Sequence, residues 1–199
     1  MSEEKKIICE AIHKKFLLIH IMKTAGVSVV KSIPEGAGGG TKHAHCRARD
    51  INRDSLSQHC SFAVIRNPYS RLVSLFRYWL SWTDYGKSSG ASAFKRALKK
   101  VENDFKRFCE EIWIPRKNFP IDQITRDSQL SFVTDDSGKV IVNHILRFEN
   151  IDEDWEKLQI ANNLPREYIT TLPRLNVSRS TGSHSKRPWR EFYDFELAE

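Results

Sequence analysis

The residues best suited to bind or react with a ligand follow the largely apolar run FLLIHI at positions 16–21. Lys23 supplies a cation, and Thr24 and Ser28 supply hydroxyl groups. Gly26 has no side chain, so backbone N–H groups around it can approach a ligand closely. The apolar residues that come next predict the start of a helix, where the first N–H groups lack partners within the helix. The segment therefore predicts an anion-binding loop, and a tight strand-to-helix turn with an exposed lysine is the alternative.

This loop differs from the phosphate loop of ordinary ATP-dependent phosphotransferases. That motif, G-x-x-x-x-G-K-[ST], contains two glycines and places its lysine after the loop. In this chain Lys23 comes before Gly26, and a second glycine is missing. A phosphotransferase that uses ATP is therefore disfavoured.

The elements that must position the loop are strands of a parallel sheet. Phe16–Ile19 and Ile21 form an apolar run without alternation, which is typical of a strand that is covered on both faces. Phe62–Ile65 is a second such run, and an Asn-Pro pair soon after it predicts a helix start. Arg66 thus falls at the carboxyl end of a strand, and Ser74 lies two helical turns further on. We expect both to face a ligand at this edge, where open α/β sheets bind their ligands.

The other elements are predicted from periodicity and turn residues. Lys42–Ser57 is predicted as a polar helix, and Leu130–Val133 with Val140–Ile141 as a β-hairpin. Ile145–Phe148 is predicted as a short strand that leads into a helix. Aromatic residues at helical spacing between positions 91 and 113 indicate packing in a core rather than platforms for nucleic-acid bases.

Length and charge limit the function classes. A chain of 199 residues suits a single domain over positions 1–199, with 1–15 as a lead-in and 175–199 as a basic, flexible tail. The 32 Lys+Arg against 25 Asp+Glu give a net charge of +7, which favours an anionic ligand. A polyanion- or nucleic-acid-binding module is therefore an alternative, with basic segments at 95–106 and 179–190. No nucleic-acid recognition motif is present, so we expect no specific nucleic-acid partner.

The cysteine pattern and the N-terminal residues bear on metal binding and on location. The cysteines at positions 9, 46, 60 and 109 are widely spaced and match no C-x-x-C metal pattern. We therefore expect free thiols and no metal. Residues 1–15 contain no long apolar segment of the kind found in secretion signals, and no run reaches transmembrane length. We expect a cytoplasmic protein without a membrane span, and the oligomeric state is left open.

Five segments carry a recognisable pattern when they are taken in order. They are HIMKTAGVS (20–28), KHAHCRA (42–48), VIRNPYSRLVSLFRYW (64–79), FVTDDSGKVIVNHILRFENI (132–151) and LPRLNVS (172–178). Together they resemble the sulfotransferase family, specifically small single-domain members of its carbohydrate-type branch, sulfotransferase family 2. The resemblance implies an α/β fold, a three-layer P-loop-like domain with a central, mostly parallel sheet flanked by helices. It also implies transfer of a sulfuryl group from 3′-phosphoadenosine 5′-phosphosulfate (PAPS) to an acceptor hydroxyl, such as that of a carbohydrate or related small molecule.

The resemblance also assigns roles to individual residues. The first loop would bind the 5′-phosphate and sulfate of PAPS through Lys23, Thr24, Ala25, Gly26, Val27 and Ser28. Arg66 and Ser74 would bind the 3′-phosphate, a contact that distinguishes PAPS from ATP. Lys186 and Arg187 resemble a segment that covers the cofactor, and a solvated charge cluster is the alternative for them.

Two residues are the candidate catalytic groups under this resemblance. Lys23 is the expected cation at the oxygen that departs from sulfur. His43 is the expected general base, because it aligns with a histidine of the family and imidazole titrates near working pH. His45 is the alternative base, and His20 is expected to orient the loop.

The loop departs from the family pattern at two positions. Family members usually have proline where this chain has Met22, and threonine where it has Val27. We expect weaker cofactor binding, by about 1 kcal/mol for one lost neutral hydrogen bond, and a catalytically degenerate member is an alternative. The chain also ends earlier than comparable members, so we expect a wall of the acceptor site to be absent or supplied by another subunit. Glycan, lipid, small-metabolite and tyrosyl acceptors all remain compatible with the sequence.

Overall fold

The computed structural model describes residues 16–32, 45–82, 96–115, 126–163, 169–174 and 187–193. The chain divides into two compact units. The first unit comprises Met1–Arg66 and Ile124–Asn176, and the second comprises Asn67–Gln123 and Val177–Glu199. The prediction of a single domain over the whole chain stays a prediction.

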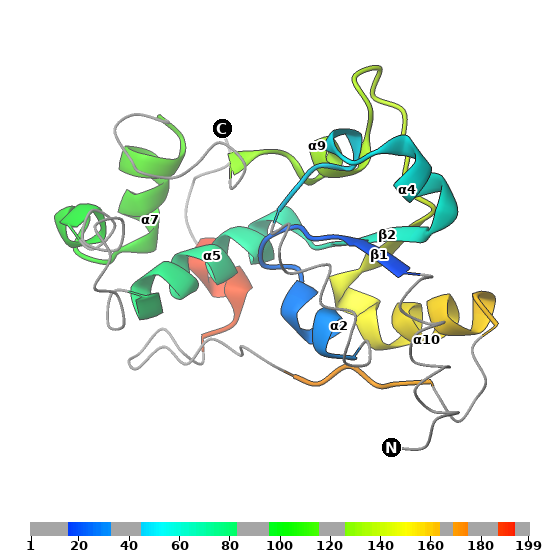
Figure 1. Ribbon diagram of the computed structural model, residues 1–199. Helices are drawn as coiled ribbons and strands as arrows, with labels where there is room; N and C mark the ends of the chain where they lie inside the picture. The colour runs from blue at the N-terminus through cyan, green and yellow to red at the C-terminus, as the bar shows by residue number, and fades with distance from the viewer. Residues whose placement is uncertain are drawn as a thin grey trace. The chain divides into compact units, whose positions relative to one another are not determined.

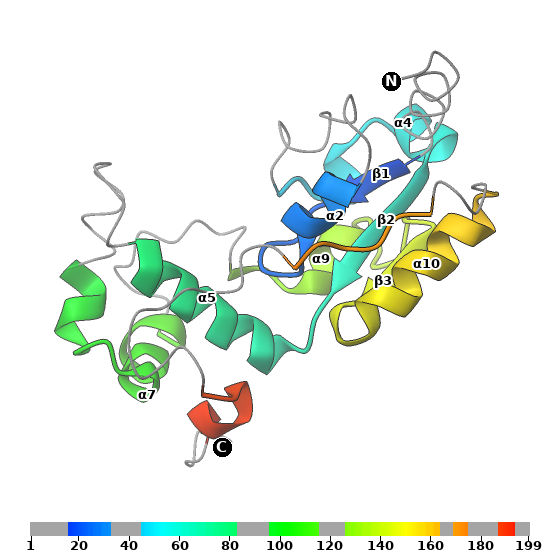
Figure 2. The ribbon, with the colours of Figure 1, turned by 90° about the horizontal axis from the view of Figure 1, so that it is seen from below.

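The first unit contains a parallel sheet of three strands, which can be followed in Figure 2. The strands are β1 (Phe16–Ile19), β2 (Cys60–Ile65) and β3 (His144–Arg147), hydrogen-bonded in that order. Leu18 of β1 lies opposite Phe62 of β2, and Phe62 lies opposite His144 of β3. Because all three strands run the same way, their carboxyl ends meet at one edge of the sheet.

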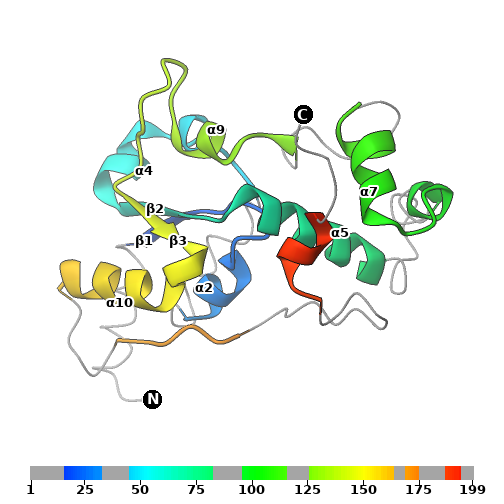
Figure 3. The ribbon, with the colours of Figure 1, turned by 180° about the vertical axis from the view of Figure 1, so that it is seen from behind.

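Helices cover both faces of this sheet. In Figures 1 and 3 the strands lie between one pair of helices, α2 (Gly26–Ser32) and α10 (Ile151–Ala161), and another pair, α4 (Arg53–Gln58) and α9 (Gln129–Val133). Side chains alternate along each strand, so Phe62 packs in the same cluster as Trp155, whereas Ala63 packs in a second cluster with Phe132. The three layers and the parallel sheet confirm the predicted α/β class.

The second unit is helical and rich in aromatic contacts. Its elements are α5 (Pro68–Trp82), α7 (Phe105–Phe108), a π-helical turn (Cys109–Trp113) and a 3₁₀ helix (Trp189–Tyr193). The ring centroid of Phe105 lies 5.3 Å from that of Phe76 and 5.3 Å from that of Phe192, both in T-shaped geometry. Phe105 and Phe108 are buried, which confirms the prediction that these aromatic residues pack in a core.

The predicted helix Lys42–Ser57 is confirmed only over its last residues, Arg53–Ser57, and is wrong over 45–52. A turn and the 3₁₀ helix Ala48–Asp50 precede α4, which starts only at Arg53. The Asn52 side chain accepts a hydrogen bond from the Asp54 N–H at 2.8 Å. An asparagine in this position caps a helix, so it fixes the start of α4 and separates it from the residues before it.

The predicted hairpin is confirmed in its turn but wrong in its first strand. Leu130–Val133 belongs to α9, whose N-terminus is capped by the Ser128 hydroxyl, which accepts from the Leu130 N–H at 3.2 Å. Across the turn, an isolated antiparallel bridge joins Thr134 to Val140, and the Ile141 N–H donates to the Val133 carbonyl at 2.9 Å. Gly138 closes the intervening turn with φ of 83°, a conformation that favours glycine.

Several predictions fall on residues that the structure does not describe. They concern the lead-in 1–15, His43, Lys186 and the tail outside residues 187–193. Among the helices that are described, none is long and apolar enough to cross a membrane.

Candidate functional site

The loop between β1 and α2 has an unusual backbone conformation. Lys23 and Ala25 take positive φ angles of 68° and 69°, and Thr24 between them does not. In anion-binding nests, alternation of this kind turns successive N–H groups toward one side, so the backbone here has the conformation that such a nest requires. Each such non-glycine residue costs about 1–3 kcal/mol and persists only when its surroundings hold it in place. The backbone of the loop is therefore strained, and neighbouring residues must stabilise its conformation.

Hydrogen bonds inside the loop account for part of that stabilisation. The Thr24 hydroxyl donates to the Ile21 carbonyl at 2.8 Å, and Thr24 is only 1% exposed. The Val29 N–H donates to the Ala25 carbonyl at 3.1 Å, which joins the loop to α2. Because the Thr24 hydroxyl proton is used within the loop, the backbone N–H is the Thr24 group better suited to donate to an anion.

The imidazole ring of His20 packs directly against Gly26. A Cβ at Gly26 would lie 2.1 Å from His20 Cδ2 and 2.2 Å from His20 Nε2, distances that no real side chain adopts. The position therefore requires glycine for a reason of space. Burial, and then the neighbouring His45, lower the pKa of His20 to about 4, so the ring is neutral at ordinary pH.

His45 lies next to the same loop. Its ring centroid is 4.6 Å from that of His20, and its Nδ1 lies 3.1 Å from the His20 carbonyl oxygen. Since a carbonyl can only accept, Nδ1 of His45 carries the proton in this contact. In the neutral form of the ring, the other nitrogen, Nε2, has the lone pair and is able to accept a proton.

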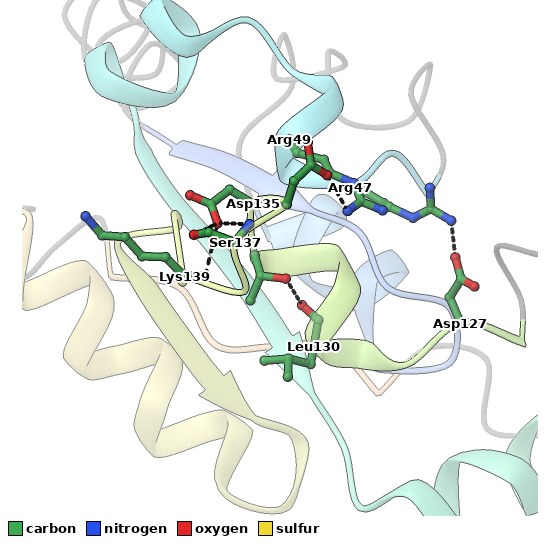
Figure 4. A network of polar contacts seen from close by, with 9 residues as sticks. Arg47, Arg49, Asp127, Leu130, Asp135, Ser137 and Lys139 are labelled. Carbon is green, nitrogen blue, oxygen red and sulfur yellow. Dashed lines mark hydrogen bonds and ion pairs between the residues drawn. The ribbon is translucent and has the colours of Figure 1, made fainter.

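The segment that carries His45 is anchored at a distance from the loop. Arg47 forms an ion pair with Asp127, and Arg49 Nη1 lies 2.9 Å from Asp136 Oδ1. Figure 4 shows both arginines reaching from the residues after His45 toward the part of the chain that contains α9 and the turn at 135–139. These contacts fix where the His45 segment passes the sheet edge.

Two cations meet at the carboxyl edge of the sheet. Arg66 follows the last residue of β2, and its Nη1 donates to the Lys23 carbonyl at 3.1 Å. Its guanidinium carbon lies 4.0 Å from the centre of the Phe148 ring, a cation–π contact. Burial, and then the positive charge of Arg66, lower the pKa of Lys23 to about 8. An anion bound here would relieve this repulsion and favour the protonated lysine.

The remaining loop residues, Ser28 and Val27, differ in their exposure to solvent. Ser28 is buried, and its carbonyl accepts a hydrogen bond from the Ser32 hydroxyl at 3.0 Å. Val27 is 41% exposed in the first turn of α2. Threonine at this solvent-facing position next to the candidate loop would add a hydroxyl donor.

The structure brings together only some of the residues that the sequence singled out. The loop Lys23–Ser28, Arg66 and His45 all belong to the first unit. Ser74, on α5, and Arg187 belong to the second unit, and their assignment to the ligand stays a prediction. The roles of His43 and Lys186 also stay predictions, because both lie outside the described residues.

Sequence reasoning missed two residues that contact Arg66. Phe148 was predicted as the end of a strand, yet it begins a 3₁₀ helix and supplies the ring under the guanidinium. Gln129 bonds both backbone groups of Arg66, and no spacing signal in the sequence links the two positions. Long-range contacts of this kind require the fold.

Cys46, Cys60 and Cys109 are free thiols. Within the ranges that the structure covers, no three His, Cys, Asp or Glu side chains are grouped in a way that could hold a metal ion.

Comparison with known proteins gives one finding. A family model described as the sulfotransferase family matches residues 12–194, a range that includes parts of both units. No curated protein and no solved structure gives a match to the chain.

Proposed function

Because the chain belongs to the sulfotransferase family, we propose that it transfers a sulfuryl group from PAPS to the hydroxyl of a carbohydrate or related small molecule. The observation that carries this proposal is the strained loop at Lys23–Ala25, which contains the cation Lys23 and is contacted by a second cation, Arg66. A doubly phosphorylated donor needs two anion sites, and the loop and Arg66 offer two neighbouring ones. We also propose that both units form one sulfotransferase domain, since the family match extends over both.

The residues present fit the donor's phosphates chemically. Backbone N–H groups of the nest suit the phosphosulfate end, because they cost little to reorganise around an anion. Arg66 suits the 3′-phosphate, because a guanidinium donates two parallel hydrogen bonds to phosphate oxygens. PAPS, when bound, would supply the activated sulfuryl group.

Transfer requires one bond to form and one to break at sulfur. The acceptor oxygen attacks sulfur in line, and the electron pair of the broken S–O bond moves to the 5′-phosphate oxygen of the departing 3′,5′-diphosphoadenosine. The ammonium group of Lys23 would offset the negative charge that grows on that oxygen. The ammonium form, favoured below its pKa of about 8, is the one that can do so.

The acceptor hydroxyl must lose its proton as it attacks, so a general base is needed. The resemblance favours His43 for this role. The geometry fits His45, since its Nδ1 faces the His20 carbonyl and its Nε2 can accept a proton. Substituting each histidine separately decides between them.

The test is transfer of labelled sulfate from PAPS to a panel of glycan, lipid, small-metabolite and tyrosyl acceptors. Lys23→Met should lower the rate by about 100-fold or more, as for loss of one oxyanion-stabilising group. Lys31→Met is the matched control, because Lys31 is exposed in the last turn of α2. Equal rates for the two variants, or the absence of transfer to every acceptor by the unaltered protein, would contradict the proposal.

A further inference from the structure

Gln129 makes an unusual pair of hydrogen bonds. Its side-chain Oε1 accepts from the Arg66 backbone N–H at 2.9 Å, and its Nε2 donates to the Arg66 carbonyl at 2.7 Å. A side-chain amide carries one acceptor and a donor group, as a peptide group does. Gln129 therefore pairs with the residue after β2 in the way a neighbouring strand would.

This pairing matters because Arg66 lies just beyond the sheet. The last residue of β2 that pairs with β3 is Ile65, opposite Arg147. Residues at the ends of elements tend to fray when no partner holds their backbone groups. Gln129 supplies that partner and fixes the point from which the Arg66 side chain extends.

Gln129 is itself held on a fixed element. It is the first residue of α9, after the capping residue Ser128. Phe132 and Val133 of the same helix are buried in the core next to the sheet. Asp127, two residues before Gln129, forms the ion pair with Arg47. The amide is thus placed by packing on one side and by an ion pair on the other.

The Arg66 side chain is oriented by other groups. Its guanidinium contacts the Lys23 carbonyl and the Phe148 ring, so its far end is held by the loop and by the ring. Gln129 contacts only the backbone in the bonds described above. A two-bond contact between a guanidinium and a phosphate depends on alignment, and a displacement of roughly 1 Å is enough to weaken it.

We propose that Gln129 is a positioning residue that sets the selectivity of the site for a 3′-phosphorylated nucleotide by fixing the backbone of Arg66. This inference rests on the proposed function, since it assumes that Arg66 contacts the 3′-phosphate. Gln129 does not touch the ligand, and its effect passes through Arg66 alone.

The experiment compares the dissociation constants of 3′,5′-diphosphoadenosine and adenosine 5′-monophosphate by calorimetry. Gln129→Met removes both hydrogen bonds without adding charge, and should lower the preference for the diphosphate by about tenfold while leaving the monophosphate nearly unchanged. Gln58→Met is the control, because Gln58 is an exposed glutamine at the end of α4. It should leave both constants unchanged.

A second background separates positioning from general support of the fold. In Arg66→Ala the backbone bonds to Gln129 can still form, but no guanidinium remains to be positioned. Adding Gln129→Met to Arg66→Ala should therefore lower the melting temperature without changing the ligand preference further. If Gln129→Met does not fold, Gln129→Asn serves instead, because its shorter side chain keeps the amide but cannot reach both groups.

The outcomes identify which claim fails. If the unaltered protein prefers the diphosphate and a folded Gln129 variant keeps that preference, the inference is overturned and the proposed function stands. Equal weakening of both ligands also overturns it, because that result indicates only structural support. If the unaltered protein shows no preference for the diphosphate, the proposed function is contradicted, and this inference with it.

Discussion

A methyl group added at Gly26 has no room beside the His20 imidazole. The alanine Cβ would lie 2.1 Å from His20 Cδ2, roughly 1.5 Å closer than the optimum for carbon atoms. The His45 ring, whose centroid lies 4.6 Å from that of His20, occupies part of the space into which the His20 ring would have to turn. Gly26→Ala should therefore destabilise the folded protein by about 1–3 kcal/mol, the usual cost of overpacking, even though alanine favours a helix more than glycine does.

The same geometry predicts a rescue. His20→Ala removes the clashing ring. In the His20→Ala background, Gly26→Ala should therefore lower the free energy of unfolding much less than it does in the unaltered protein. The expected coupling free energy is roughly 1–3 kcal/mol, measured by urea unfolding of the four proteins. The donor affinity of each variant should follow the same order, because this loop is the proposed donor site.

Gly138→Ala is the control for this cycle. Gly138 has φ of 83° and no atom within 4 Å of an added Cβ, so alanine there strains the backbone without a clash. His20→Ala should give no rescue of Gly138→Ala. The reasoning is refuted if the effects at positions 20 and 26 are simply additive, or if Gly26→Ala is as stable as the unaltered protein.

Three further predictions concern the same site. The pKa of Lys23 in the free protein is about 8, so kcat/KM for the donor should fall as pH rises through that value. Lys23→Arg, which stays charged, should flatten this profile, and an unchanged profile would contradict the role of the lysine. Either His43→Ala or His45→Ala should lower kcat by about 100-fold with donor affinity unchanged, which identifies the base; near-normal turnover in both would exclude both. Val27→Thr should tighten donor binding by about fivefold through one added hydrogen bond, and equal binding would show that the hydroxyl does not reach the ligand.

Much of the sheet could be predicted because buried strands appear in the sequence as continuous apolar runs. The strands β1 and β2 are short continuous apolar runs, as expected of strands covered on both faces. The position of Arg66 followed from the end of the second run. These are local signals, and local signals are what a sequence displays most directly.

The wrong predictions share a physical cause. Leu130–Val133 contains residues that suit a strand, but Ser128 caps a helix there and the core accepts Phe132 and Val133 from that helix. The positive φ angles of Lys23 and Ala25 leave no trace in residue types, because neither is glycine. Tertiary contacts impose these conformations against local preference, so they become visible only in the folded chain.

The most direct test of the central claim is calorimetric titration with 3′,5′-diphosphoadenosine and with ATP. We expect the diphosphate to bind and ATP to bind at least about tenfold more weakly. Arg66→Ala should remove most of this difference, whereas Arg53→Ala, at an exposed position of α4, should leave it intact. Equal binding of the two nucleotides, or no binding of the diphosphate, would contradict the claim that this loop and Arg66 form the donor site of a sulfotransferase.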